Sequence, residues 1–299
     1  MSKLARYERE VCAVLVVAFV VVFDPHVDSV SPANQSGQRM TTSFAVSHDG
    51  TRIAFDVAGK GPAVVLLHGG GQSRRVWHEV GYVGRLVNQF TVITMDLRGH
   101  GESDKPTSVE AYAVDRLTDD ILAVAEAAQV ARFAVWGYSY GGNIARYLPM
   151  RSDRVSKLVI IGIPFGAAAP PPFRTLIRDL RAKWGPIVDR DRAGTLDVGS
   201  LTAEDRAVWQ TGTPLGNVPV VLAWLVAMLD WPSVEPADLR CSTLWLVGTG
   251  NENAMPSVKE YSESLAGTKV KLHLVPALTH EEELARVDES FPPMVKFTE

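Results

Sequence analysis

The residues best suited to chemistry lie in one short stretch, 133–142, where an apolar run ends in a serine flanked by glycines. The run predicts a buried strand, and a sharp turn into a helix would hold Ser139 in a strained, left-handed backbone conformation. Only very small residues fit two positions before and after it, and Gly137 and Gly141 stand there. We interpret the stretch as a nucleophile elbow that exposes the serine hydroxyl and aims the Tyr140 N–H at a developing oxyanion. The alternative is a glycine-rich loop whose serine has no catalytic role. The two interpretations are distinguished by whether the rest of the sequence supplies the partners that a nucleophile needs.

A serine hydroxyl is a weak nucleophile at neutral pH, so it needs a base within hydrogen-bond reach. That base needs an acceptor to fix its tautomer and stabilise its charge. His280 lies just past the last predicted strand, at the sheet edge from which Ser139 emerges, and we predict it as the base. No comparable placement near the serine is predicted for His26, His48, His78 and His273.

A regular alternation of strands and helices is expected to position these residues. Residues 63–67 form an apolar run that ends in a glycine-rich loop, which is typical of a buried parallel strand. Residues 115–128 carry apolar side chains at helical spacing. The alternation predicts an α/β fold with a mostly parallel, doubly wound sheet. Further strands are expected at 42–48, 52–57, 91–95, 158–163, 243–247 and 270–275, and further helices at 76–88 and 142–150.

Composition restricts the class of protein. The 299 residues are 46% apolar and 21% charged, which is ordinary for a globular chain and sufficient for one large domain with an insertion. A net charge of -4 without a basic cluster argues against nucleic acid as a partner. The two cysteines form no disulfide framework, and no cysteine–histidine spacing predicts a metal site. The expected ligand is small and not polyanionic.

The first 39 residues differ from the rest of the chain. Basic residues precede an apolar run at 11–23, which resembles a signal peptide but is short for a membrane span. A short membrane anchor through this run is one interpretation, and cleavage after export is another. The third is that Met40 is the true start and residues 1–39 are not translated, because a strand pattern begins directly after it. The protein would then be cytoplasmic.

Strand periodicity is lost at residues 166–235, which we interpret as a helical cap over the site. A proline-rich linker at 167–172 leads into segments with helical patterns. The cap holds four of the seven tryptophans: Trp184, Trp209, Trp224 and Trp231. Some could face an acyl or aromatic substrate, whereas most are expected to bury the cap helices on the core.

The order of four motifs adds a family resemblance. The loop at 68–72, the loop at 96–104, the elbow around Ser139 and the late His280 follow one another as in the serine α/β-hydrolases, which the chain resembles from residue 41 onward. The resemblance implies a core at 40–165 and 236–299, a cofactor-free reaction and structural roles for the histidines of both loops. It also implies an oxyanion hole made by the N–H groups of Gly70 and Tyr140, with Gly71 as a neighbouring option.

The triad acid departs from the family pattern. The family usually places an aspartate after the strand at 243–247, but Asn251 stands at about that position. Glu252 is the nearest carboxylate in the same loop, and we predict it as the acid. The family's other common place, after the strand at 158–163, has no carboxylate nearby in the sequence. Asp230, at the exit of the cap, is the distant alternative.

The resemblance implies a hydrolase that acylates Ser139 with a small, apolar carboxylic ester or lactone. A carbon–carbon bond hydrolase or an enol-lactonase would use the same machinery. Epoxide hydrolases and haloalkane dehalogenases are disfavoured because their elbows carry aspartate where Ser139 stands. A receptor that binds ligand without turnover is the alternative from another class, and the missing aspartate favours it.

Overall fold

The computed structural model describes residues 42–299. The expectations for residues 1–39, for the apolar run at 11–23 and for initiation at Met40 lie outside the described residues. Within 42–299, no helix combines the length and the apolar content needed to cross a bilayer.

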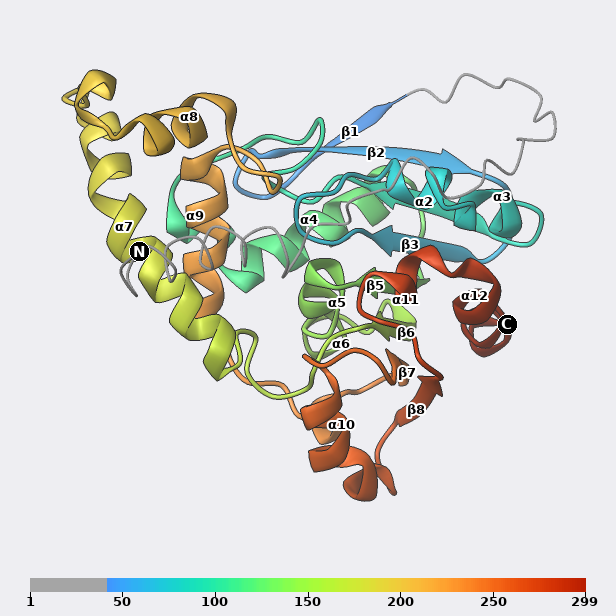
Figure 1. Ribbon diagram of the computed structural model, residues 1–299. Coiled ribbons are helices and arrows are strands. Elements are labelled where there is room, and N and C mark those ends of the chain that lie inside the picture. The colour runs from blue at the N-terminus through green and yellow to red at the C-terminus, as the bar shows by residue number, and fades with distance from the viewer. Residues whose placement is uncertain (1–41) are drawn as a thin grey trace.

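An eight-stranded sheet forms the centre of the molecule, in the order β1-β2-β4-β3-β5-β6-β7-β8 (Figure 1). The first two strands pair antiparallel with each other, and β2 pairs antiparallel with β4. All remaining neighbours are parallel. This arrangement confirms the predicted α/β fold. The strands are β1 (Ser43–Val46), β2 (Arg52–Ala58), β3 (Ala63–Leu67), β4 (Thr91–Met95), β5 (Phe133–Tyr138), β6 (Val155–Ile161), β7 (Ser242–Gly248) and β8 (Val270–Val275).

The centre of the sheet is buried on both faces, and its strands β3 and β5 consist of apolar and aromatic residues and one glycine. In β3, Val65 and Leu67 pack into one cluster, and Val64 and Leu66 pack into another on the opposite face. Side chains of α4 (Val114–Ala127), α5 (Tyr140–Ala145) and α10 (Met255–Tyr261) complete the first cluster. Those of α2 (Val76–Glu79), α3 (Tyr82–Leu86), α11 (Glu282–Ala285) and α12 (Val287–Thr298) complete the second.

Two helices predicted as continuous are interrupted. The predicted helix at 76–88 is divided into α2 and α3 at Gly81, whose φ is 89°. The predicted helix at 142–150 is divided into α5 and α6 (Leu148–Arg151). Pro149 lies in the first turn of α6 and has no N–H to donate to a preceding turn. In each case a glycine or a proline interrupts the helix, although the spacing of apolar residues predicts that it continues.

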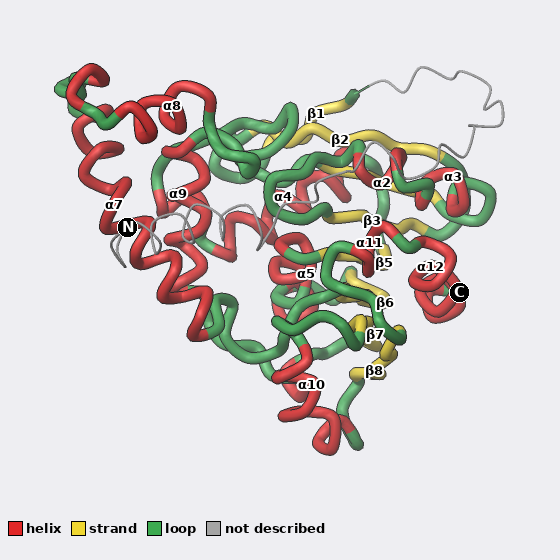
Figure 2. The backbone as a smooth tube through the Cα atoms, viewed as in Figure 1, coloured by secondary structure: helices red, strands yellow, loops and turns green. Residues whose placement is uncertain are grey.

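The segment between β6 and β7 is helical and adds no strand to the sheet (Figure 2). It contains α7 (Pro171–Arg192), α8 (Ala203–Thr211) and α9 (Val218–Ala227), and these helices lie together beside the core (Figure 1). Short 3-10 helices occupy η1 (Val109–Tyr112), η2 (Val198–Ser200), η3 (Met228–Asp230), η4 (Pro236–Asp238) and η5 (Ser262–Leu265). The division into a core and a cap at 166–235 stays a prediction, to which this layout is favourable.

Candidate active site

Ser139 lies in a tight turn between β5 and α5. Its backbone angles, φ 51° and ψ −117°, lie outside the regions that residues other than glycine favour. A Cβ added to Gly137 would lie 2.7 Å from the Gly141 carbonyl oxygen, and one added to Gly141 would lie 2.4 Å from the Leu67 carbonyl oxygen. The backbone therefore approaches too closely for any side chain at these two positions.

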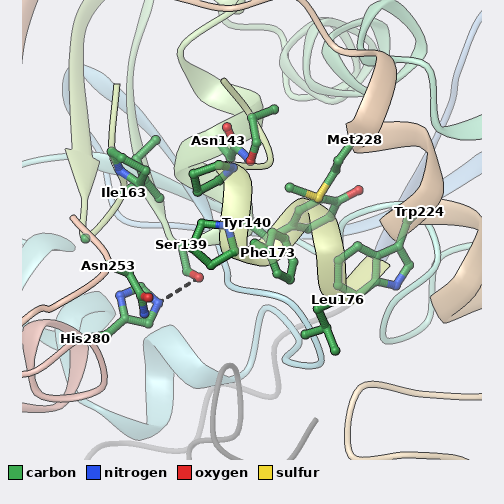
Figure 3. A pocket seen from close by; sticks show the side chains of 15 residues that line it. Ser139, Tyr140, Asn143, Ile163, Phe173, Leu176, Trp224, Met228, Asn253 and His280 are labelled. Atoms are coloured by element: carbon green, nitrogen blue, oxygen red, sulfur yellow. Dashed lines mark hydrogen bonds between the residues drawn. The ribbon is translucent and has the colours of Figure 1, made fainter. Parts of the chain in front are cut away.

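His280 faces Ser139 from the loop between β8 and α11. Its Nε2 lies 2.9 Å from the Ser139 Oγ (Figure 3). The Tyr138 ring stacks on the imidazole, with centroids 5.1 Å apart, and the Tyr138 hydroxyl donates to the His280 carbonyl at 3.0 Å. Tyr138 and Ser139, at the end of β5, thus contact both the ring and the backbone of the histidine.

A buried carboxylate, Glu283, stands behind the histidine. Its Oε2 lies 3.2 Å from Nδ1 of His280, and its side chain is fully buried. The Gly248 N–H donates to Oε1 at 2.6 Å, and the Asn251 amide donates to the same oxygen at 3.0 Å. A serine, an imidazole and a carboxylate therefore form a continuous line of hydrogen bonds.

The carboxylate beside His280 is thus not the predicted one, and the assignment of Glu252 as the acid needs correction. Glu252 is exposed, whereas the preceding Asn251 turns inward and is 1% exposed. Asp230, the alternative, is also exposed. The sequence contains a conditional signal for Glu283: if a helical turn starts at His280, the residue three positions later faces the same side. The family pattern directs attention to the loops after the strands instead, and Glu283 lies outside both of them.

Gly162, just past β6, provides the space for this carboxylate. Its φ is 73°, and an added Cβ would lie 2.0 Å from Oε2 of Glu283 and 2.8 Å from Nδ1 of His280. Glu283 therefore lies between the two loops in which the family's acid is expected, although it comes from a third segment.

Two backbone N–H groups lie near the serine. Tyr140 is the first residue of α5, so its N–H has no acceptor within the helix. Gly70 lines a small cavity with Ser139 and His280. Within residues 42–299, neither N–H donates to a backbone carbonyl of a turn or loop. At Gly71, the neighbouring option, an added Cβ would lie 2.9 Å from the Leu215 side chain.

The loops after β3 and β4 hold Gly70 in place through buried polar contacts. His68 Nδ1 donates to the Gly69 carbonyl at 2.7 Å, and its Nε2 accepts from the Leu97 N–H at 3.0 Å. Burial lowers the pKa of His68, and burial likewise lowers the pKa of His100 to about 3. Both rings are therefore neutral at physiological pH. Arg74 pairs with Asp96 and so joins the same two loops.

A cavity of about 210 Å³ opens beside Ser139, between the core and the helical segment. Apolar side chains dominate its wall, and Trp224, Met228 and Leu176 lie across it from His280 (Figure 3). The Trp224 ring packs on Tyr140, with centroids 4.7 Å apart.

The other three tryptophans of the segment do not line this cavity. Trp184 and Trp209 stack on each other at 6.4 Å, and the Trp231 indole donates to the Tyr112 carbonyl. Trp231 is thus packed against the core, as expected for most of these rings, whereas Trp184 and Trp209 join α7 to α8 within the segment. Within 42–299, no group of three histidine, cysteine, aspartate or glutamate side chains is arranged to hold a metal ion.

Known proteins share this architecture. The family model described as "alpha/beta hydrolase fold" matches residues 62–213, about half of the chain. The chain belongs to this family. An uncharacterized protein of Mycobacterium tuberculosis is 38% identical over 125 residues, which are 40% of this chain and 34% of the relative. A soluble epoxide hydrolase of a Corynebacterium species is 32% identical over 138 residues, 44% of this chain and 47% of that protein. The chain thus spans a third to a half of the length of these curated relatives.

Solved structures extend the similarity to most of this hydrolase-family chain. An esterase from Exiguobacterium antarcticum matches with a TM-score of 0.66 at 19% identity, and covers 86% of this chain and 99% of its own. An esterase from a Rhodococcus species matches with a TM-score of 0.62 at 23% identity, and covers 87% and 98%. At these identities the comparison supports the fold.

We predict that Gly162→Ala destabilises the protein more than Gly267→Ala does. Both glycines have positive φ, 73° and 86°, so both variants carry the cost of a left-handed alanine, about 1 kcal/mol. Only the Cβ at position 162 would collide with the Glu283 carboxylate, because position 267 has no atom within 4 Å. Thermal denaturation of both variants measures the difference. Equal losses would mean that Glu283 is not confined as described.

Proposed function

We propose that the protein is a serine hydrolase that cleaves a small carboxylic ester or lactone through an acyl-enzyme intermediate. The observation that carries this proposal is the 2.9 Å contact between Ser139 Oγ and His280 Nε2, made at a strained turn beside an apolar cavity. Family membership supports the hydrolase class, and the side chains at the site support the serine chemistry.

In the first half of the reaction, Ser139 Oγ attacks the carbonyl carbon of the substrate while His280 Nε2 takes the hydroxyl proton. The carbonyl oxygen becomes an oxyanion and accepts hydrogen bonds from the N–H groups of Gly70 and Tyr140. Each such donor is worth roughly 10²–10³-fold in rate. The intermediate then expels the alcohol, which receives its proton from His280, and leaves the acyl group on the serine.

In the second half, water attacks the acyl carbon as His280 takes one of its protons, and Ser139 is released when that proton returns to Oγ. The small cavity lined by Gly70, Ser139 and His280 measures about 10 Å³, which is room for one water molecule. The 210 Å³ cavity on the other side of the serine is the proposed acyl site.

Glu283 is the proposed acid of this triad. It accepts the hydrogen bond from His280 Nδ1 and stabilises the imidazolium that forms in each half of the reaction. A receptor without turnover was considered because the family's usual aspartate is missing. In this proposal the Glu283 carboxylate takes the place of that aspartate.

Epoxide hydrolysis is not the activity that we propose, although epoxide hydrolases occur among the relatives. The elbow of such enzymes carries an aspartate, and this chain has Ser139 at that position. A serine attached to an opened epoxide would form an ether, which this machinery has no means to hydrolyse.

The nucleophile assignment predicts that a fluorophosphonate probe labels the wild-type protein once, and that Ser139→Ala abolishes both labelling and ester hydrolysis. His280→Ala should reduce turnover by at least about 10³-fold, because the general base is lost. Mass spectrometry of the labelled protein and a screen of chromogenic esters by acyl size provide the measurements. Labelling that persists in Ser139→Ala would refute the assignment.

The acid assignment predicts that Glu283→Gln lowers kcat by about 10⁴-fold with little change in KM, since the amide cannot stabilise the imidazolium. Glu252→Gln is the matched control, because it makes the same change in the exposed carboxylate first predicted from the sequence. Its kcat should stay close to that of wild type, because this carboxylate lies outside the hydrogen bonds that join Ser139, His280 and Glu283. A large loss of kcat in Glu252→Gln, with kcat near wild type in Glu283→Gln, would instead identify Glu252 as the acid.

The acyl-site assignment predicts that Trp224→Leu shifts preference toward longer acyl chains, because it enlarges the cavity. The ratio of kcat/KM for a long and a short ester should change by about tenfold, the scale on which one or two methylenes are discriminated. Trp209→Leu removes a half-buried indole from the same segment but away from the cavity. Equal shifts in both variants would contradict the assignment.

A further inference from the structure

The Asn251 side chain is buried against the Glu283 carboxylate, and its neighbours determine which way the amide faces. Its Oδ1 accepts from the backbone N–H groups of Asn253 and Ala254, each at 3.1 Å. An amide nitrogen cannot accept these bonds, so the oxygen must face them and Nδ2 must face the opposite side.

Nδ2 has two hydrogens and more acceptors than it can serve. The Gly162 carbonyl lies at 3.1 Å, and the two Glu283 oxygens lie at 3.0 and 3.1 Å. One hydrogen serves the carbonyl and the other serves the carboxylate. His280 Nδ1, at 3.2 Å from the same nitrogen, therefore keeps its own proton and donates it to Glu283. In this tautomer Nε2 carries no proton and can accept one from Ser139.

We propose that Asn251 is a positioning residue that holds the Glu283 carboxylate against His280. We also propose that the site accommodates one negative charge, which a carboxylate at either position 251 or position 283 can carry. The inference rests on the serine-hydrolase function proposed above. Asn251 Nδ2 and Glu283 Oε2 each lie 3.2 Å from Nδ1 of His280, so a carboxylate at either position reaches the imidazole. This chain carries the acid at 283 and the uncharged amide at 251.

A carboxylate at both positions would be unfavourable. The two residues are 1% and 0% exposed, and an oxygen in place of Nδ2 would lie about 3 Å from both Glu283 oxygens. Two buried carboxylates at that distance cannot both ionise without a large cost. Exchanging the two groups restores one carboxylate and one amide, and an aspartate at 251 retains the oxygen that accepts from Asn253 and Ala254.

The test is a cycle of Asn251→Asp, Glu283→Gln and the double variant, with kcat measured per fluorophosphonate-titrated site. Glu283→Gln alone should lose about 10⁴-fold in kcat. The kcat of the double variant should be at least about 100-fold higher than that of Glu283→Gln, with a KM within a few-fold of the wild-type value. The reason is that the carboxylate is again within reach of His280. A double variant that folds but is no more active than Glu283→Gln overturns the proposal.

Melting temperatures supply a readout that does not depend on turnover. Asn251→Asp should lower the melting temperature in the wild-type background and lower it much less in the Glu283→Gln background. Asn88→Asp, on an exposed residue, controls for the added charge and should shift both backgrounds equally. Additive effects of Asn251→Asp would show that the two positions do not share one charge. If wild type lacks Ser139-dependent turnover, the proposed function fails, and this cycle still decides the inference.

Discussion

The left-handed backbone at Ser139 is the constraint on which the candidate site depends. A non-glycine residue held there costs of order 1–3 kcal/mol, which the surrounding sheet must supply. The backbone N–H of Ser139 donates to the Ile161 carbonyl, and that of Gly141 donates to the His68 carbonyl. These bonds tie the turn to the ends of two neighbouring strands. The same turn starts α5 at Tyr140 and leaves its N–H unused within the helix.

The second requirement is a satisfied carboxylate in a buried site. Buried charges are stable only when donors surround them, and Glu283 receives bonds from Gly248, Asn251 and His280. Glu283 and His280 belong to one segment, three residues apart, so they are positioned together. The loop after β7, in which the family usually carries the acid, supplies donors to it instead.

The candidate site and the cavity beside it are built from different parts of the chain. Ser139 and His280 lie on turns at the ends of strands, whereas the cavity wall across from His280 comes from α7, α9 and the residue that follows α9. Trp224 connects the two parts because its ring packs on Tyr140 of the elbow. Changes in the helical segment would therefore alter the cavity, and a change at Trp224 would also reach the turn at Ser139.

The sequence by itself determined the strands and the turn at Ser139, because both depend on local properties: β3, β4 and β8 begin and end at the predicted residues, and glycines stand where the backbone must approach closely. Only the tertiary structure decided which carboxylate meets His280. Three glutamates follow that histidine directly, and the rotation of the chain as it turns into α11 places only the third, Glu283, against the imidazole. The loop after β7 likewise turns Asn251 inward and leaves Glu252 exposed. Side-chain direction in a loop depends on contacts between segments far apart in the chain, which no local pattern encodes.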